Sequence, residues 1–186
     1  MKNHSPQDHA PEDRPPCFVK FRVADLERFK LLAQAFEILK QEKLKYFAEI
    51  SASEEAPEND SQERALQNIV ASLHKLFDEQ ALAHFWWPSQ QEVEDYWRRW
   101  FATPLPQRFT NPSLKTSWAF ESMIRCFLDG EYELISCRLL TSDTGVLAFD
   151  PFSFPYGGTD CMKALIEAFD FQVIGEDNGT GYTACI

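Results

Sequence analysis

Apolar side chains recur at spacings of three and four residues along the first half of the chain, with Glu and Lys between them. The first stripe begins at Leu26 and predicts a long helix over about residues 25–50, for which Asp25 is a suitable N-cap. A second stripe follows a polar, acidic segment and predicts a helix that begins near Ser61 and ends before Pro88. The pattern therefore favours helices over most of the first half of the chain.

A third helix is expected from Ser89, whose hydroxyl and the carboxylate of Glu92 have the spacing of a capping box. Its apolar positions recur at helical spacing, so we expect them to form an inner stripe that packs in the core: Val93, Trp97, Trp100 and Phe101. Three prolines then mark a connector without helix: Pro104, Pro106 and Pro112.

Glycine marks a change of structure, because all seven glycines lie after residue 129. Gly130 ends a helix with an apolar face, and the segments 132–140 and 146–149 flank a polar turn, which predicts a hairpin. A further helix begins near Thr159, and a second hairpin signal surrounds residues 177–179. The order of elements in the last third of the chain is therefore α-β-β-α-β-β.

These elements predict an α+β fold, in which an N-terminal helical segment of about three helices packs on a small C-terminal α-β-β-α-β-β module with antiparallel hairpins. We divide the chain into a disordered tail over residues 1–16, a helical region over 17–103 and an α+β module over 104–186. We expect the helical region and the module to form one compact body.

The chain of 186 residues carries 18 Lys and Arg against 29 Asp and Glu, a formal net charge of −11. Nucleic-acid binding draws its affinity from cations that neutralise phosphates, so this charge argues against a nucleic-acid partner and favours a protein with a basic surface. No apolar run approaches the ~20 residues that span a bilayer, so we expect no membrane insertion. The densest basic cluster alternates with glutamates and is interpreted as a solvated helix face: Lys40, Lys43 and Lys45.

Five cysteines lie far apart and form no C-x-x-C pair, which removes the common zinc and redox motifs. The first residues lead into no apolar region of a secretory signal. Reduced thiols and the missing export signal favour the cytoplasm. We expect no cofactor and no metal site, and the sequence leaves the oligomeric state open.

Seven aromatic residues fall within seventeen positions between Phe85 and Phe101. Trp86, Trp87 and Tyr96 lie off the inner stripe of the third helix, and we interpret them as candidates for a protein-binding surface. Tryptophan and tyrosine suit this role because they combine a large apolar area with a polar group.

A second candidate site is the loop that leads from a strand into the helix near Thr159. Two glycines before a helix N-terminus let backbone N–H groups approach an anion, as in phosphate loops. The loop lacks the Gly-Lys-Ser/Thr ending of such loops, and Asp160 would repel a phosphate, so a tight turn is the favoured interpretation. A ligand pocket here would be lined by Tyr156, Gly157, Gly158, Thr159, Asp177 and Tyr182.

Nucleophilic catalysis needs a base beside the nucleophile, and outside the tail only His74 and His84 can serve. They face different directions on a predicted helix, and a pair of Cys161 with His84 would require a contact between the two halves of the chain. Asp150 and Asp177 follow predicted strands, where turn formation explains both. The residues therefore favour a protein without catalytic activity.

Two functions remain open at this point. The first is a non-catalytic, acidic, cytoplasmic interaction protein, such as an inhibitor, an immunity-type protein or an adaptor, that docks a basic partner. The second is an enzyme or small-ligand-binding module with its site at the 155–160 loop of the C-terminal unit.

Overall fold

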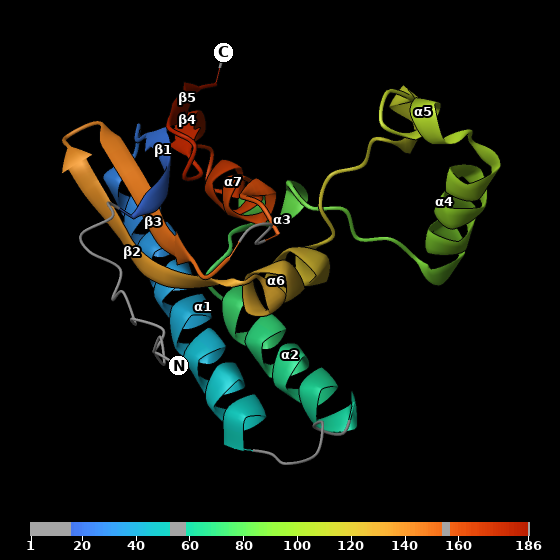
Figure 1. Ribbon diagram of the computed structural model, residues 1–186, viewed down its shortest axis with the longest axis horizontal. Coiled ribbons are helices and arrows are strands. Elements are labelled where there is room, and N and C mark those ends of the chain that lie inside the picture. The colour runs from blue at the N-terminus through green and yellow to red at the C-terminus, as the bar shows by residue number, and fades with distance from the viewer. Residues whose placement is uncertain (1–15, 53–58, 154–156, 186) are drawn as a thin grey trace, which may run out of the picture.

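The computed structural model describes residues 16–52, 59–153 and 157–185. In chain order the elements are β1 (Cys17–Arg22), α1 (Leu26–Ala52), α2 (Asn59–His74), α3 (Glu79–Ala83), α4 (Gln90–Ala102), α5 (Leu105–Arg108), the 3-10 helix η1 (Pro112–Leu114), α6 (Phe120–Asp129), β2 (Tyr132–Thr141), β3 (Thr144–Pro151), α7 (Asp160–Ala168), β4 (Gln172–Asp177) and β5 (Tyr182–Ala184) (Figure 1). The predicted α+β fold is confirmed, with helices first and antiparallel hairpins in the C-terminal part.

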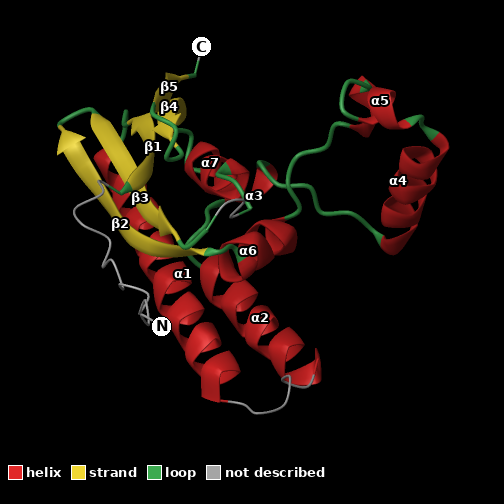
Figure 2. Ribbon diagram, viewed as in Figure 1, coloured by secondary structure: helices red, strands yellow, loops and turns green. Residues whose placement is uncertain are grey.

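The five strands form one antiparallel sheet in the order β2-β3-β1-β4-β5. Both predicted hairpins are present, as β2–β3 and β4–β5. Helix α1 packs across β2, and α7 packs against β1 and β4, so helices cover one face of the sheet (Figure 2). Each hairpin joins two strands that are consecutive in the sequence, and β1 links the two hairpins by pairing with β3 and β4.

Strand β1 lies at the centre of the sheet, although the sequence analysis assigned its residues to a helical region. Val19 pairs with Leu147 of β3 on one side and with Glu176 of β4 on the other. Val19 and Phe21 are fully buried, whereas Lys20 between them faces away from the helices and stays partly exposed. Buried Cys17, Val19 and Phe21 alternate with the more exposed Phe18, Lys20 and Arg22, which is the period of a half-buried strand. This strand was missed because the segment is only six residues long.

Helix α1 begins as predicted, because the Asp25 carboxylate accepts hydrogen bonds from the backbone N–H groups of Glu27 (2.8 Å) and Arg28 (3.2 Å). The second predicted helix is interrupted. Helix α2 ends at His74, and α3 begins anew behind Asp78, whose carboxylate accepts from the N–H of Ala81 at 2.7 Å. A short Asp side chain competes with helical hydrogen bonds and favours such a cap.

Four phenylalanines join the first three helices to the C-terminal module. The ring of Phe77 lies 5.1 Å from that of Phe120 on α6 and 4.7 Å from that of Phe169 beyond α7, and Phe85 lies 5.0 Å from Phe120. All four rings are buried. Aromatic pairs at these separations stabilise a fold beyond the burial of apolar surface, so this cluster holds the first three helices and the C-terminal module together.

The interpretation of Lys40, Lys43 and Lys45 as a solvated helix face is wrong, because Lys43 is buried. Its side chain is only 2% exposed, and Lys40 is half-buried with its ammonium donating to the carbonyl of Ile135 at 2.8 Å. Of the three lysines only Lys45 is exposed. The ammonium of Lys43 lies at the end of α6, where backbone carbonyls lack helical partners and attract a cation.

Candidate protein-docking surface

The segment 89–117, which we call the lobe, contains α4, α5 and η1 and stands to one side of the body (Figure 1). Its two ends meet at the body. The backbone N–H of Trp86 donates to the carbonyl oxygen of Trp118 at 2.9 Å, and Trp86 forms a parallel bridge with Ala119. This bridge closes the base of the lobe and joins two chain segments that are distant in sequence.

Helix α4 starts with the predicted capping box. The Glu92 carboxylate accepts from the backbone N–H of Ser89 at 2.7 Å and from its hydroxyl at 2.8 Å, and both hydrogen bonds lower the pKa of Glu92. The helix ends at Thr103, whose N–H donates to the carbonyl of Arg99 at 3.0 Å, and Pro104 prevents its continuation. Local sequence therefore sets both ends of α4.

The expectation that the inner stripe of α4 packs in the core is wrong. None of the residues of α4 is buried, and Trp97 and Phe101 are 48% and 70% exposed. Helical spacing of apolar residues shows that a helix has an apolar face, but it does not show which molecule covers that face. Among the described elements α4 packs mainly on η1 of its own lobe, and no residue of its stripe is buried by the body.

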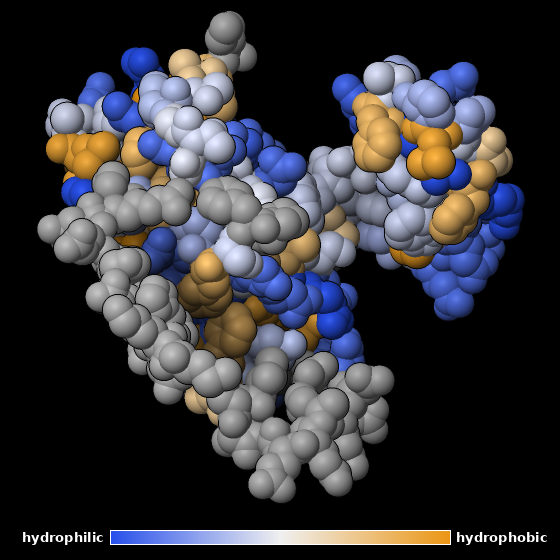
Figure 3. Space-filling view, viewed as in Figure 1, coloured by the Kyte–Doolittle hydropathy of each residue, from blue (hydrophilic) through white to orange (hydrophobic). Residues whose placement is uncertain are grey.

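The aromatic rings of the lobe stack on one another. Tyr96 lies 5.8 Å from Trp86, 5.3 Å from Trp97 and 6.0 Å from Trp100, and Trp97 stacks on Phe101 at 5.8 Å. Figure 3 shows apolar side chains gathered on the outside of the lobe. The most exposed large apolar side chains there are those of Phe101, Leu105 and Phe109.

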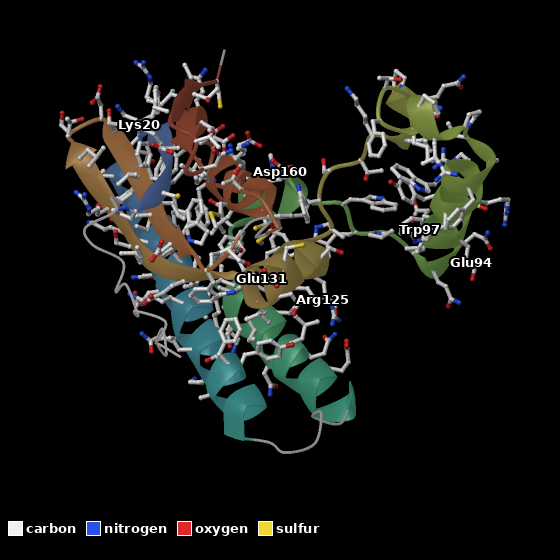
Figure 4. The ribbon with its side chains drawn as sticks, viewed as in Figure 1. Lys20, Glu94, Trp97, Arg125, Glu131 and Asp160 are labelled. Atoms are coloured by element: carbon white, nitrogen blue, oxygen red, sulfur yellow. The ribbon has the colours of Figure 1, made fainter. Side chains whose placement is uncertain are left out.

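A groove of about 990 Å³ lies between the lobe and the body. Its aromatic walls come from both sides: Trp86, Trp87, Tyr96, Trp97, Trp118 and Phe120. Figure 4 places Trp97 on the side of α4 that faces the body. Ligand sites in proteins typically enclose ~300–1,000 Å³, so the groove is large enough for a peptide segment.

The structure brings the three predicted docking residues Trp86, Trp87 and Tyr96 together at this groove. Trp87 is half exposed, its ring stacks on that of Phe120 at 5.3 Å, and its Nε1 donates to the carbonyl of Leu82 at 2.9 Å. Sequence reasoning missed Trp118, because it lies more than thirty residues after Trp86 and Trp87 in a polar segment without periodicity. Its position here depends on the backbone hydrogen bond from Trp86 and on the bridge between Trp86 and Ala119.

The lobe differs in charge from the rest of the chain. It carries four basic and three acidic side chains, which leaves 14 basic and 26 acidic side chains elsewhere. Arg108 lies 5.8 Å from the ring centroids of Trp100 and Phe101, and its Nε donates to the carbonyl of Thr103 at 2.8 Å. The strong negative charge thus belongs to the body and tail, whereas the lobe is nearly neutral and aromatic.

The second candidate site is occupied by contacts within the chain. Gly157 and Gly158 adopt positive φ angles of 97° and 80° before α7, and Tyr156 lies outside the described residues. The hydroxyl of Thr159 does not cap α7 but donates to the carboxylate of Glu176, which also accepts from the Lys163 ammonium at 2.9 Å. Carboxylates at this helix end disfavour a phosphate.

Asp177 and Tyr182 serve the β4–β5 hairpin, away from the lobe (Figure 1). The Asp177 carboxylate accepts from the N–H groups of Gly179 at 2.8 Å and Gly181 at 3.2 Å, as an Asx turn requires. Tyr182 stacks on Phe18 at 6.2 Å and donates to a backbone carbonyl of β4 at 3.2 Å. The structure therefore separates these residues from Trp86, Trp87 and Tyr96.

The structure also separates the two members of each residue pair that was considered for catalysis. Cys161 contacts the hydroxyl of Tyr132 at 3.5 Å, and burial raises the pKa of its thiol to about 11. His84 faces Glu167 at the opposite end of α7, at 4.0 Å. Asp150 and Asp177 lie on β3 and β4, which are separated by β1.

Within the described ranges, no three His, Cys, Asp or Glu side chains converge as metal ligands. In the same part of the chain, no helix combines the length and the apolar character needed to cross a bilayer. Comparison of the chain with protein-family models, curated proteins and solved structures finds no match.

Proposed function

We propose that this chain is a non-catalytic interaction protein, of the inhibitor, immunity-type or adaptor kind, whose lobe docks a protein partner with a basic surface. The observation that carries the proposal is helix α4, which buries none of its residues although Trp97 and Phe101 lie on it. Burial of one large apolar side chain is worth ~1.5–3 kcal/mol. The chain forgoes this stabilisation in its own fold, and a partner that covers the rings recovers it.

The composition of the lobe supports the same proposal. Residues that dominate binding energy in protein interfaces are enriched in Trp, Tyr and Arg, and they cluster in apolar patches. The lobe holds Tyr96, Trp97 and Trp100 in one stack, with the guanidinium of Arg108 over Trp100. Phe109, at the edge of this stack, is 74% exposed.

The charge of the chain supports a basic partner. Outside the lobe the chain carries 26 acidic and 14 basic side chains. The negative electrostatic field of this excess raises the encounter rate with a positively charged protein. The nearly neutral lobe then supplies an apolar contact area with few charges to desolvate. We further propose a cytoplasmic location, because the five cysteines are free thiols, two of which, Cys126 and Cys185, are exposed.

The experiment is affinity capture from a native lysate of the source organism, with the wild-type chain and a Phe101→Ala/Phe109→Ala double variant as baits. The wild type is expected to retain a stoichiometric partner of high pI, with yield falling as salt rises, and the double variant is expected to lose it. Phe152→Ala is the matched control, since Phe152 is an exposed aromatic residue outside the lobe. No stoichiometric partner, or equal capture by the double variant, would contradict the proposal.

A further inference from the structure

The groove between the lobe and the body combines aromatic faces with free hydrogen-bond donors. Trp86, Tyr96, Trp97 and Trp118 line it. Their indole N–H and phenol O–H groups make no hydrogen bond to any residue that the structure describes. These donors are therefore available to acceptors of a bound molecule.

This combination fits a peptide in the polyproline II conformation. Such a chain has three residues per turn and no internal hydrogen bonds, so its carbonyl groups remain free to accept from Trp and Tyr donors, while proline rings pack on aromatic faces. An α-helical ligand already uses most of its carbonyl groups internally. A peptide added as a strand would pair with β2 or β5, the edges of the sheet, and neither strand lines the groove.

The charge of the groove selects a cation on the peptide. Glu121 is the only charged residue among the described residues that line it. Its carboxylate is half-buried and accepts from the amide of Gln67 at 2.8 Å. The nearby cation Arg125 interacts electrostatically with Glu121 but is paired with Glu63 at 3.0 Å, so the Glu121 carboxylate keeps acceptor capacity for a second donor. The cations Arg98, Arg99 and Lys115 line a separate, smaller groove of the lobe, together with Glu92 and Asp95.

We propose that this groove binds a proline-rich segment in the polyproline II conformation, with a Lys or Arg side chain of the segment paired with Glu121. The inference rests on the proposed function and names the part of the basic partner that enters the groove. Aromatic rings and indole donors provide the contact with the proline-rich backbone, and Glu121 fixes its direction and register.

The test uses the full chain and synthetic probes, followed by intrinsic tryptophan fluorescence and by calorimetry. The main probe is a proline-rich peptide of about ten residues with one central arginine, long enough for about three turns of polyproline II. Comparison probes are the same peptide with glutamate in place of arginine, an alanine-rich helical peptide with one arginine, and single-stranded oligo(dT). Saturable binding of the main probe is expected, at least about tenfold tighter than binding of each comparison probe.

Two variants locate the binding. Trp97→Ala is expected to weaken binding of the main probe about tenfold, and Glu121→Gln is expected to reduce the preference for arginine over glutamate to within about threefold. Phe152→Ala and Glu133→Gln are the matched controls, since both residues are exposed and lie outside the lobe and its groove, and they are expected to keep wild-type affinity. Circular dichroism of each variant checks that the fold is retained.

Three results would overturn the inference: no saturable binding of the main probe, tighter binding of oligo(dT), or unchanged affinity in Trp97→Ala. If the basic partner is captured and then lost with the Phe101→Ala/Phe109→Ala bait while the peptide does not bind, only this inference falls. If the peptide binds as expected and no partner is captured, the groove chemistry is supported and the docking function is not.

Discussion

The ammonium of Lys43 on α1 donates a hydrogen bond to the carbonyl oxygen of Gly130 at 2.6 Å, and so ties α1 to the junction between α6 and β2. The same ammonium donates to the carbonyls of Phe127 at 2.7 Å and Leu128 at 3.0 Å, and it lies 4.5 Å from the ring centroid of Tyr132. Three acceptors require the three N–H groups of the protonated form. The last turn of α6 therefore takes its cap from a distant helix.

Lys43→Met is expected to lower the free energy of unfolding by about 3 kcal/mol, because three carbonyl groups lose a shared donor inside the protein. Urea denaturation followed by circular dichroism measures the change. The control is Lys45→Met, which removes an exposed lysine paired with Glu42 and is expected to cost less than ~1 kcal/mol. Similar losses in the two variants would contradict the capping role of Lys43.

A second, independent test of Lys43 compares how the free energy of unfolding changes with pH in the wild type and in Lys43→Met. Burial lowers the pKa of Lys43 from 10.5 to about 8, against the opposing effects of Cys161 and Asp129. Between about pH 8 and 10.5 the unfolded chain thus binds more protons than the folded chain at this residue, so its contribution to stability rises with pH.

The difference in unfolding free energy between wild type and Lys43→Met is therefore expected to widen by about 3 kcal/mol from pH 7.5 to about pH 10.5. The buried thiol of Cys137 acts with the opposite sign, since burial raises its pKa to about 12, but it is present in both proteins and cancels in the difference. A constant difference over this range would show that Lys43 keeps its ordinary pKa, and a shrinking difference would show that folding raises it.

The variants Phe109→Ala and Phe120→Ala compare the contributions to stability of an exposed ring in the lobe and a buried ring in the core. Phe109 is largely exposed, so its truncation is expected to change the free energy of unfolding by less than ~0.5 kcal/mol. Phe120 is buried between Phe77, Phe85 and Trp87, and its truncation is expected to cost about 3–5 kcal/mol. A large loss in Phe109→Ala would mean that the ring packs in the fold and is not a docking surface.

Gly145→Ala tests how closely β3 packs against the neighbouring strand β1. A Cβ at Gly145 would lie 2.5 Å from ring carbons of Phe21, which is fully buried and has no space to move, so the change is expected to cost about 1–3 kcal/mol. Gly175→Ala is the comparison, because its Cβ meets the ring of Tyr182, which is half exposed and can turn into solvent. The melting temperature should fall clearly for the first variant and by less for the second.

Local chemistry explains which elements the sequence predicted. The Ser89–Glu92 capping box, the Asp25 cap and the turn of the β4–β5 hairpin each depend on side chains within a few residues of the backbone they bind. Strand β1 was missed because its partners, such as Leu147 and Glu176, are more than a hundred residues away. Pairing at that distance leaves no local signal beyond a short alternation.

The docking surface was predicted only in part for the same reason. Trp86, Trp87 and Tyr96 stood out as an aromatic cluster, but Trp118 and Glu121 join them only through the bridge between Trp86 and Ala119. Lys43 was interpreted as a solvated lysine because the basic cluster alternates with glutamates along the chain. Its burial depends on the position of α6, which no pattern within α1 records.

By itself the sequence determined α1, α4, α6, α7, the two hairpins and the negative charge, because capping, turn formation and ionisation act over a few residues. Only the tertiary structure decided that β1 fills the centre of the sheet, that Lys43 is buried and that the stripe of α4 lies uncovered. Burial depends on which surfaces meet in three dimensions, and an apolar stripe has the same spacing whether it faces its own core or another molecule.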